Sequence, residues 1–495
     1  MILTLVLFFT ILLYMLSDTI DDFAPKHIGI SWMILNDNDD LSGFQWFFDQ
    51  VPGFYIFVAE LMLISGISGI SISTTPILLV PYTFTFFIFV YILSKRKTYL
   101  ATLLLLFMFS SSRIGTYRIF MWAAGMGQIT YYVILSLVLF DRSKWQYSLL
   151  MIISLLALPF ISYNLTFHTI CFLIMFLVIG VRKSSFRNIE NQRILILISL
   201  PFIIEFGLMR FVYNTYIPLM RGINLESNVI KSFVIFIKYL FGQSISQGII
   251  IKEFAISIPK EIMTISIFKY ATLSFFTLLS LKTIYKQDLQ KGGQNANRLF
   301  LSLLGVAFFF VVFRAAIGGL AATVLFFPSI VAITILCNHN RQGVKYRKLV
   351  YSALIVLVIT NFTVISLSHQ SGLVQKDDYS YIRQSANWVS RYVTSDVFFP
   401  DQLTSSWFYF QFCYLDRNLT RGYLGGDDIL AIYTGDDISH GKIIIINYRT
   451  NYNAIGGWTA LKSFRYFRYK IETNPSVQGK IYSLNEDIVI IITQR

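Results

Sequence analysis

The sequence predicts an α-helical polytopic membrane protein with a small C-terminal exterior α/β domain. Three observations lead to this prediction. Of the 495 residues, 55% are hydrophobic, the mean hydropathy is +0.60, and long apolar runs recur along the chain. Such a composition lies outside the range of soluble globular domains. Because open sheets leave backbone groups unsatisfied in lipid, the runs are predicted to be helices.

Each apolar run has about the length that crosses roughly 30 Å of hydrocarbon as a helix. About eleven spanning helices are therefore expected. The runs cover residues 1–17, 76–93, 98–110, 119–140, 146–163, 165–181, 194–212, 264–281, 299–317, 319–337 and 349–367. The first run has no basic segment before it and no small-residue cleavage site, which favours a retained signal anchor.

The net charge of +14 is concentrated in short segments between the apolar runs. The basic segments are 95–97, 142–144, 182–193, 282–298 and 341–348. Positive charge marks cytoplasmic loops, so this pattern indicates membrane orientation and argues against a nucleic-acid partner. All these segments share one side only if residues 52–70 do not cross the membrane. Residues 54–72 are therefore expected to form a surface helix.

This topology divides the chain into two predicted domains. Residues 1–367 form the transmembrane domain, with exterior loops at 18–53 and 213–262. Residues 368–495 have ordinary polar content, a helical pattern at 379–393 and strand-like runs in KIIIIN and DIVIIITQ, which indicate an exterior soluble α/β domain. The expected location is the cell membrane, as a multi-pass protein with an extracellular C-terminal domain.

Asp21 and Asp22 are the candidate catalytic residues because they closely follow the first apolar run. A carboxylate held at a lipid–water boundary is suited to act as a general base toward an acceptor hydroxyl. The later cluster NDNDD, residues 36–40, has turn chemistry and fits a solvated loop. It lacks the Gly and the distal Glu of a calcium loop, so no metal site is predicted.

Four further polar residues are candidates for binding a sugar phosphate or a lipid phosphate. Arg314 lies in an apolar run, where a guanidinium is costly unless it snorkels or binds a partner such as a phosphate. Arg113 and Arg118 flank an expected exterior turn, where they would bind a headgroup or pair with the acidic loop. His168 lies near the outer mouth of the bundle, in a functional or a structural role.

The order of features in the N-terminal third resembles the GT-C superfamily of polytopic glycosyltransferases. An apolar run is followed by an acidic loop, the aromatic-rich GFQWFFDQVPGFYIF, a stretch ending in ISGIS and a run ending in SKRK. The resemblance implies that an Asp after the first helix is the catalytic base, which assigns this role to Asp21 or Asp22, with Asp18 as a third candidate. It also implies a phosphate-binding role for Arg314. The chain lacks the WWDYG-type signature of oligosaccharyltransferases.

The resemblance implies an inverting membrane glycosyltransferase that moves a sugar from a polyprenyl-phosphate donor to an acceptor at the outer face. The expected partners are this donor, membrane lipids and a glycan, lipid or protein acceptor. No cofactor is indicated, and a divalent cation is compatible with the chemistry. Two alternatives stay open: a polysaccharide polymerase or ligase, and a transporter or flippase of lipid-linked sugars.

Overall fold

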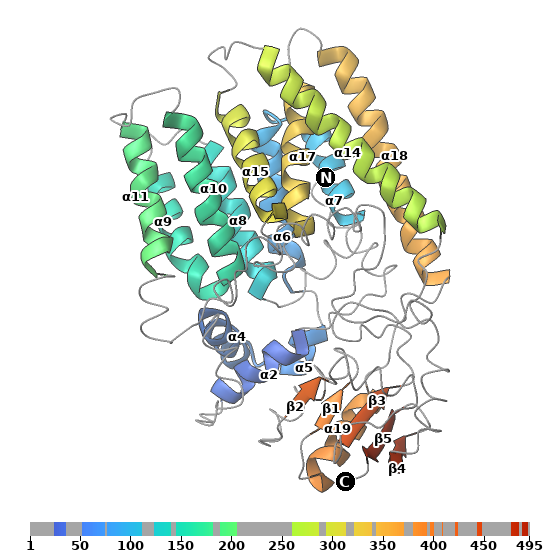
Figure 1. Cartoon of the computed structure of the whole chain (residues 1–495). Helices are drawn as coiled ribbons and strands as arrows, with labels where there is room; N and C mark the ends of the chain where they lie inside the picture. Colours follow the sequence, from blue (N-terminus) through green and yellow to red (C-terminus); the bar gives the residue numbers. More distant parts are fainter. Residues whose placement is uncertain are drawn as a thin grey trace.

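The computed structural model places helices over most of the apolar runs and a small mixed sheet near the C-terminus. It describes residues 24–35, 52–74, 77–110, 123–139, 145–181, 189–204, 260–286, 294–312, 321–338, 343–370, 380–393, 397–399, 408, 421–423, 443–447, 477–484 and 488–493. The architecture has three parts: a helical bundle, a layer of short helices beneath one end of it, and a C-terminal α/β unit (Figure 1).

The bundle consists of helices that each overlap an apolar run of the sequence. They are α6 (Leu79–Leu93), α7 (Thr98–Ser110), α8 (Ala123–Leu139), α9 (Trp145–Ile161), α10 (Tyr163–Val181), α11 (Ile189–Ile203), α14 (Lys260–Lys286), α15 (Gln294–Val312), α17 (Ala321–Asn338) and α18 (Gly343–Gln370). Helix α6 packs on α7 and α8, α10 packs on α15, and α17 packs on α14, α15 and α18. The bundle thus combines contacts between consecutive helices with contacts between helices that are distant in the sequence.

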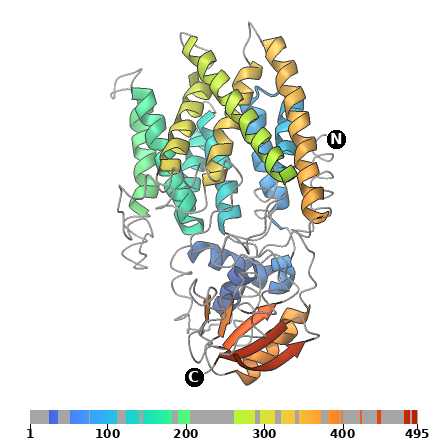
Figure 2. The same ribbon diagram turned by 45° about the vertical axis from the view of Figure 1, so that its right-hand side comes forward.

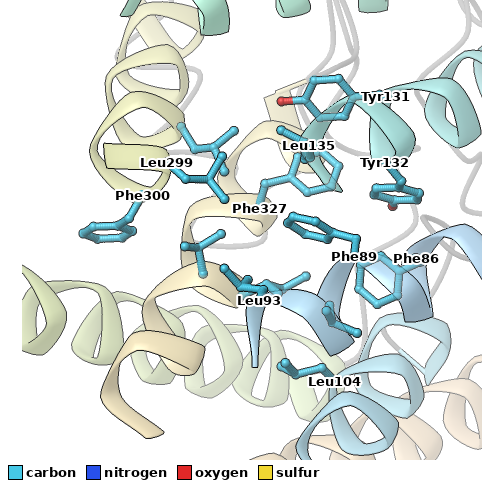
Figure 3. Packing of buried hydrophobic residues seen from close by; sticks show 14 of the residues in the cluster. Phe86, Phe89, Leu93, Leu104, Tyr131, Tyr132, Leu135, Leu299, Phe300 and Phe327 are labelled. Atoms are coloured by element: carbon cyan, nitrogen blue, oxygen red, sulfur yellow. The ribbon is translucent and has the colours of Figure 1, made fainter. Parts of the chain in front are cut away.

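Aromatic rings fill the centre of the bundle and join helices that are distant in the sequence (Figure 3). The Tyr132 ring of α8 lies 5.1 Å from Phe86 of α6 and 5.8 Å from Phe327 of α17, both in edge-to-face geometry. Such pairs contribute about 0.5–1.5 kcal/mol beyond the burial of their area. They fix α6, α8 and α17 around one core.

Three short helices form a layer beneath one end of the bundle: α2 (Ala24–Leu35), α4 (Pro52–Ser65) and α5 (Gly69–Thr74) (Figures 1 and 2). Pro52 occupies the first position of α4, where its fixed φ and missing N–H are tolerated. After α4, Gly66 has φ 65°. A glycine reaches this left-handed conformation at little cost, and it breaks the helical run before α5.

The C-terminal unit combines α19 (Ser380–Tyr392) with a five-stranded sheet. The strands are β1 (Val397–Phe399), β2 (Arg421–Tyr423), β3 (Ile443–Asn447), β4 (Val477–Leu484) and β5 (Ile488–Thr493), in the order β2-β1-β3-β5-β4. Strand β1 pairs in parallel with β2 and β3, whereas β5 pairs antiparallel with β3 and β4. Helix α19 and strands β3 and β5 coincide with the helical and strand-like runs of the sequence.

The predicted fold class, a polytopic GT-C-like membrane protein with about eleven spanning helices, is wrong for the part of the chain that the structure describes. None of its helices combines the length and the apolar character that crossing a membrane requires. A span needs about 20 apolar residues. Helix α7 has 13 residues and α6 has 15, while the longer α14 contains Lys269 in its middle. The predicted first run, 1–17, and most of loop 213–262 lie outside the described residues.

Candidate functional site

Five of the six candidate site residues lie outside the described part of the chain: Asp21, Asp22, Arg113, Arg118 and Arg314. The structure places only His168, which lies in α10. For the other five candidates, the structure shows the helix ends that border them in the sequence. Helix α2 begins at Ala24, α7 ends at Ser110, α8 begins at Ala123, α15 ends at Val312 and α17 begins at Ala321.

The beginnings of α6 and α8 lie at the bundle end that the layer covers. Leu78, directly before α6, and Ala123, the first residue of α8, belong to the same buried cluster as Phe54 and Val58 of α4. That cluster continues into α19, β1 and β3 of the C-terminal unit. One apolar core therefore connects the bundle end, the layer and the sheet.

The end of α15 and the beginning of α10 lie at the same bundle end. Phe309, near the end of α15, has its ring centroid 6.5 Å from that of Phe167, near the start of α10. At the end of α9, a Cβ on Gly53 of α4 would lie 2.7 Å from the Phe160 Cβ. The backbone of α4 thus touches α9, and the absence of a side chain at Gly53 makes this close approach possible.

His168 is buried among aromatic rings. Its ring centroid lies 5.0 Å from that of Tyr131, edge-to-face, and 6.4 Å from that of Phe327. The side chain is 1% exposed, and burial lowers the pKa of His168 well below its usual value. A neutral imidazole can exchange hydrogen bonds, but it brings no positive charge to a phosphate.

Next to His168, a buried polar network joins α6, α7 and α8. The Tyr82 hydroxyl donates to Gln128 Oε1 at 3.1 Å and lies 3.2 Å from the Tyr132 hydroxyl. The Tyr132 hydroxyl in turn lies 3.6 Å from the sulfur of Met108. Sequence reasoning missed this network, although a glutamine inside the apolar run AAGMGQITYYVILSLVL is a recognisable signal.

A second polar contact lies in the layer, between α2 and α4. The His27 Nδ1 atom is 2.8 Å from the Tyr55 hydroxyl, and the Phe54 ring packs edge-to-face on the imidazole at 5.7 Å. Burial raises the pKa of Tyr55 far above its usual value, so its hydroxyl stays protonated. His27 is only partly buried, and it lies five residues after Asp22 in the sequence.

The described residues offer no cluster of His, Cys, Asp or Glu side chains that would hold a metal ion. The cysteines described, Cys171 and Cys337, are not in a disulfide. Burial raises the pKa of the Cys337 thiol to about 12, so it is neither a thiolate ligand nor a nucleophile at neutral pH.

Comparison with known proteins assigns the chain to no family. No protein-family model matches it, and no curated protein matches it either. The resemblance to GT-C glycosyltransferases accordingly depends on the order of features in the N-terminal third of the sequence.

Proposed function

We propose that the protein transfers a sugar from a polyprenyl-phosphate donor to a glycan, lipid or protein acceptor. Asp21 or Asp22 removes the proton from the acceptor hydroxyl, whose oxygen attacks the anomeric carbon of the sugar. The bond from that carbon to the phosphate oxygen breaks, and its electron pair leaves with the polyprenyl phosphate. This single displacement inverts the anomeric carbon, as in inverting glycosidases.

The observation that carries the proposal is the common position of the helix ends described above. The starts of α8 and α10 and the end of α15 lie at the bundle end that α2 and α4 cover. These elements border the segments that contain the candidate carboxylates and arginines. A transferase needs its base and its phosphate-binding cations around one substrate, because correct positioning supplies much of the rate acceleration.

The phosphate-binding role in this proposal belongs to Arg314, with Arg113 and Arg118 as additional ligands. A guanidinium binds a phosphate through two parallel N–H donors, which fixes the orientation of the leaving group as well as neutralising its charge. His168 is proposed to support the site through packing, because its buried ring contacts Tyr131 and Phe327.

A lipid-borne donor agrees with the apolar surface of the bundle. Large hydrophobic side chains are exposed on several helices, among them Leu149, Leu150 and Ile153 of α9 and Phe275 and Leu278 of α14. Extended apolar surface of this kind is characteristic of contact with lipid or with a partner. We propose that the protein acts at the cell membrane with its C-terminal unit on the outer side, where lipid-linked sugars are used.

The test is native mass spectrometry of the detergent-purified full chain, combined with an assay for covalent sugar transfer. We expect a co-purifying polyprenyl phosphate or its sugar conjugate, which Arg314→Ala loses and Arg391→Ala, an exposed change on α19, retains. Asp21→Asn and Asp22→Asn test the base: one of them should retain the lipid but lose transfer. Lipid-linked sugar that crosses vesicles without forming a new glycosidic bond would contradict the proposal in favour of transport.

A further inference from the structure

A group of basic side chains surrounds the C-terminus of α17, at the bundle end opposite the layer. We define the basic cap as Lys95, Arg96, Lys97, Arg347 and Lys348. The first three form the turn between α6 and α7, and the last two lie in the first turns of α18. Lys95, Arg96 and Lys348 are exposed, whereas Lys97 and Arg347 are partly buried.

Two cap residues are fixed on the end of α17 by hydrogen bonds. Lys97 Nζ donates to the Cys337 carbonyl oxygen at 3.1 Å and to Asn338 Oδ1 at 2.7 Å. Arg347 Nε donates to the same Cys337 oxygen at 3.1 Å. Asn338 Nδ2 donates to the Leu93 oxygen of α6 at 3.1 Å. Lys97 and Arg347 thus hold a defined geometry rather than extending freely into solvent.

The turn that presents the other cations is strained. Lys95 has φ 54° and Arg96 has φ 66°, in the left-handed region that costs a non-glycine residue about 1–2 kcal/mol. Glycine or asparagine would adopt this turn more cheaply. Backbone bonds maintain it, including one from the Arg96 N–H to the Tyr91 oxygen at 2.8 Å. Two long basic side chains are therefore presented at a cost to the fold.

The charges of the cap repel one another. The pKa of Lys97 is lowered by burial first, and also by the charges of Arg347 and Lys95. No carboxylate is among these influences within the described residues. A bound anion would relieve this repulsion.

Apolar side chains lie directly beside the cations. Tyr99, two residues after Lys97, is 58% exposed, and Leu349, next to Lys348, is 47% exposed. The Tyr99 ring packs edge-to-face on Tyr351 of α18 at 5.3 Å, so it has a fixed position. Basic residues alternating with exposed tyrosine and leucine are typical of protein surfaces at a lipid headgroup layer.

We propose that the basic cap binds the phosphate of an anionic lipid headgroup, with Tyr99 and Leu349 contacting the adjoining acyl region. Lys95 and Arg96 neutralise the phosphate from the turn, and Arg347 binds it from α18, where no contact of its terminal Nη groups is seen within the described residues. This site is separate from the proposed transfer site, which lies at the other end of the bundle, and it does not depend on sugar transfer.

The test measures the melting temperature of the full chain in a neutral detergent with short-chain phosphatidylglycerol, short-chain phosphatidylcholine or inorganic phosphate. We expect phosphatidylglycerol alone to raise the melting temperature of the wild type, because a ligand that binds only the folded state stabilises it. The increase should shrink as sodium chloride is added, since salt screens exposed charges.

The variant for this test is the double substitution Lys95→Asn and Arg96→Asn. It removes two charges, and asparagine adopts the left-handed conformation of the turn readily. Without lipid it should melt no lower than the wild type, and with phosphatidylglycerol its increase should be lost. Arg391→Gln, a change that is also exposed but lies on α19, should retain the full increase. An unchanged increase in the double variant, or an equal response to phosphatidylcholine or inorganic phosphate, would overturn the proposal. Lys348→Gln provides a second, independent charge removal, and it should reduce the increase in part.

Discussion

The His27 Nδ1 atom and the Tyr55 hydroxyl lie 2.8 Å apart and connect α2 to α4 within the layer beneath the bundle. The two rings are 5.6 Å apart at 30°, so the contact combines a hydrogen bond with ring packing. Tyr55 is fully buried. Because α2 begins two residues after Asp22, this contact fixes the described helix closest in sequence to the proposed catalytic carboxylates.

The first prediction concerns the pH dependence of stability through Tyr55. Burial raises its pKa in the folded protein, whereas the unfolded chain has the ordinary value near 10. The folded state then holds a proton that the unfolded state loses, so the stability that Tyr55 contributes is complete below pH 10 and decreases above it. Thermal unfolding from pH 8 to pH 11 should show a steeper loss of stability in the wild type than in Tyr55→Phe.

The matched control for this prediction is Phe54→Leu, which alters the adjacent buried ring without removing a titratable group. It should lower stability by about the same amount at every pH in the range, because it removes buried ring volume but no proton-binding group. Parallel pH curves for the wild type and Tyr55→Phe would show that the tyrosine does not control this decline.

The second prediction concerns the contact between the layer and the bundle at Gly53. A Cβ at this position would lie 2.7 Å from the Phe160 Cβ and 3.1 Å from the Phe160 backbone oxygen. The backbone of α9 at Phe160 cannot move aside as the tip of a side chain can. Gly53→Ala should therefore destabilise the protein by about 1–3 kcal/mol, the usual cost of overpacking. Hydrogen exchange should show increased opening of α4 in the variant, with little change in α14 and α15.

The third prediction concerns the buried network of Tyr82, Gln128 and Tyr132. Gln128→Leu removes the acceptor at 3.1 Å and leaves the Tyr82 hydroxyl with one fewer partner in a buried site. The expected cost is about 1–3 kcal/mol in the free energy of unfolding. The double variant with Tyr82→Phe should recover part of this loss, because donor and acceptor are then removed together. Additive losses in the double variant would show that the two residues are not coupled.

Helix positions could be predicted from the sequence because they depend on local hydrophobicity. The apolar runs at 98–110 and 319–337 agree closely with α7 and α17. The predicted fold class is wrong because, in the described part of the chain, the apolar runs do not form helices that are long and apolar enough to span a membrane. Within the run at 76–93, helix α6 begins only at Leu79. Helix α14 extends the run at 264–281 into charged residues at both ends.

The contacts around the candidate site were beyond sequence reasoning because they join residues far apart in the chain. Tyr82 and Tyr132 are separated by 50 positions, and no local periodicity connects them. His168 stands out in the sequence as a polar residue in an apolar run. Its aromatic surroundings, Tyr131 and Phe327, depend on how α8, α10 and α17 pack together. The aspartates and arginines proposed for the site remain predictions from the sequence.

The last prediction concerns Gly180 of α10 and Arg298 of α15. Arg298 Nε donates to the Phe176 carbonyl oxygen at 2.6 Å, and its guanidinium lies 4.0 Å from the Phe176 ring centroid. A Cβ on Gly180 would occupy the position of the Arg298 guanidinium atoms. Gly180→Ala should therefore displace Arg298 and lower stability by about 1.5–3 kcal/mol, the usual contribution of a hydrogen bond to a charged group.

Gly305→Ala is the matched control, because its new Cβ would meet only the end of the flexible Met175 side chain. Alanine is favoured over glycine inside a helix by about 0.5–1 kcal/mol, so this variant should be neutral or more stable. Gly180 lies one residue before α10 ends, where this gain in helix propensity is smaller but not a penalty, so a loss there must come from the displaced guanidinium. If both variants gained stability equally, Arg298 could leave Phe176 without cost, and the contact between α10 and α15 would depend on apolar packing alone.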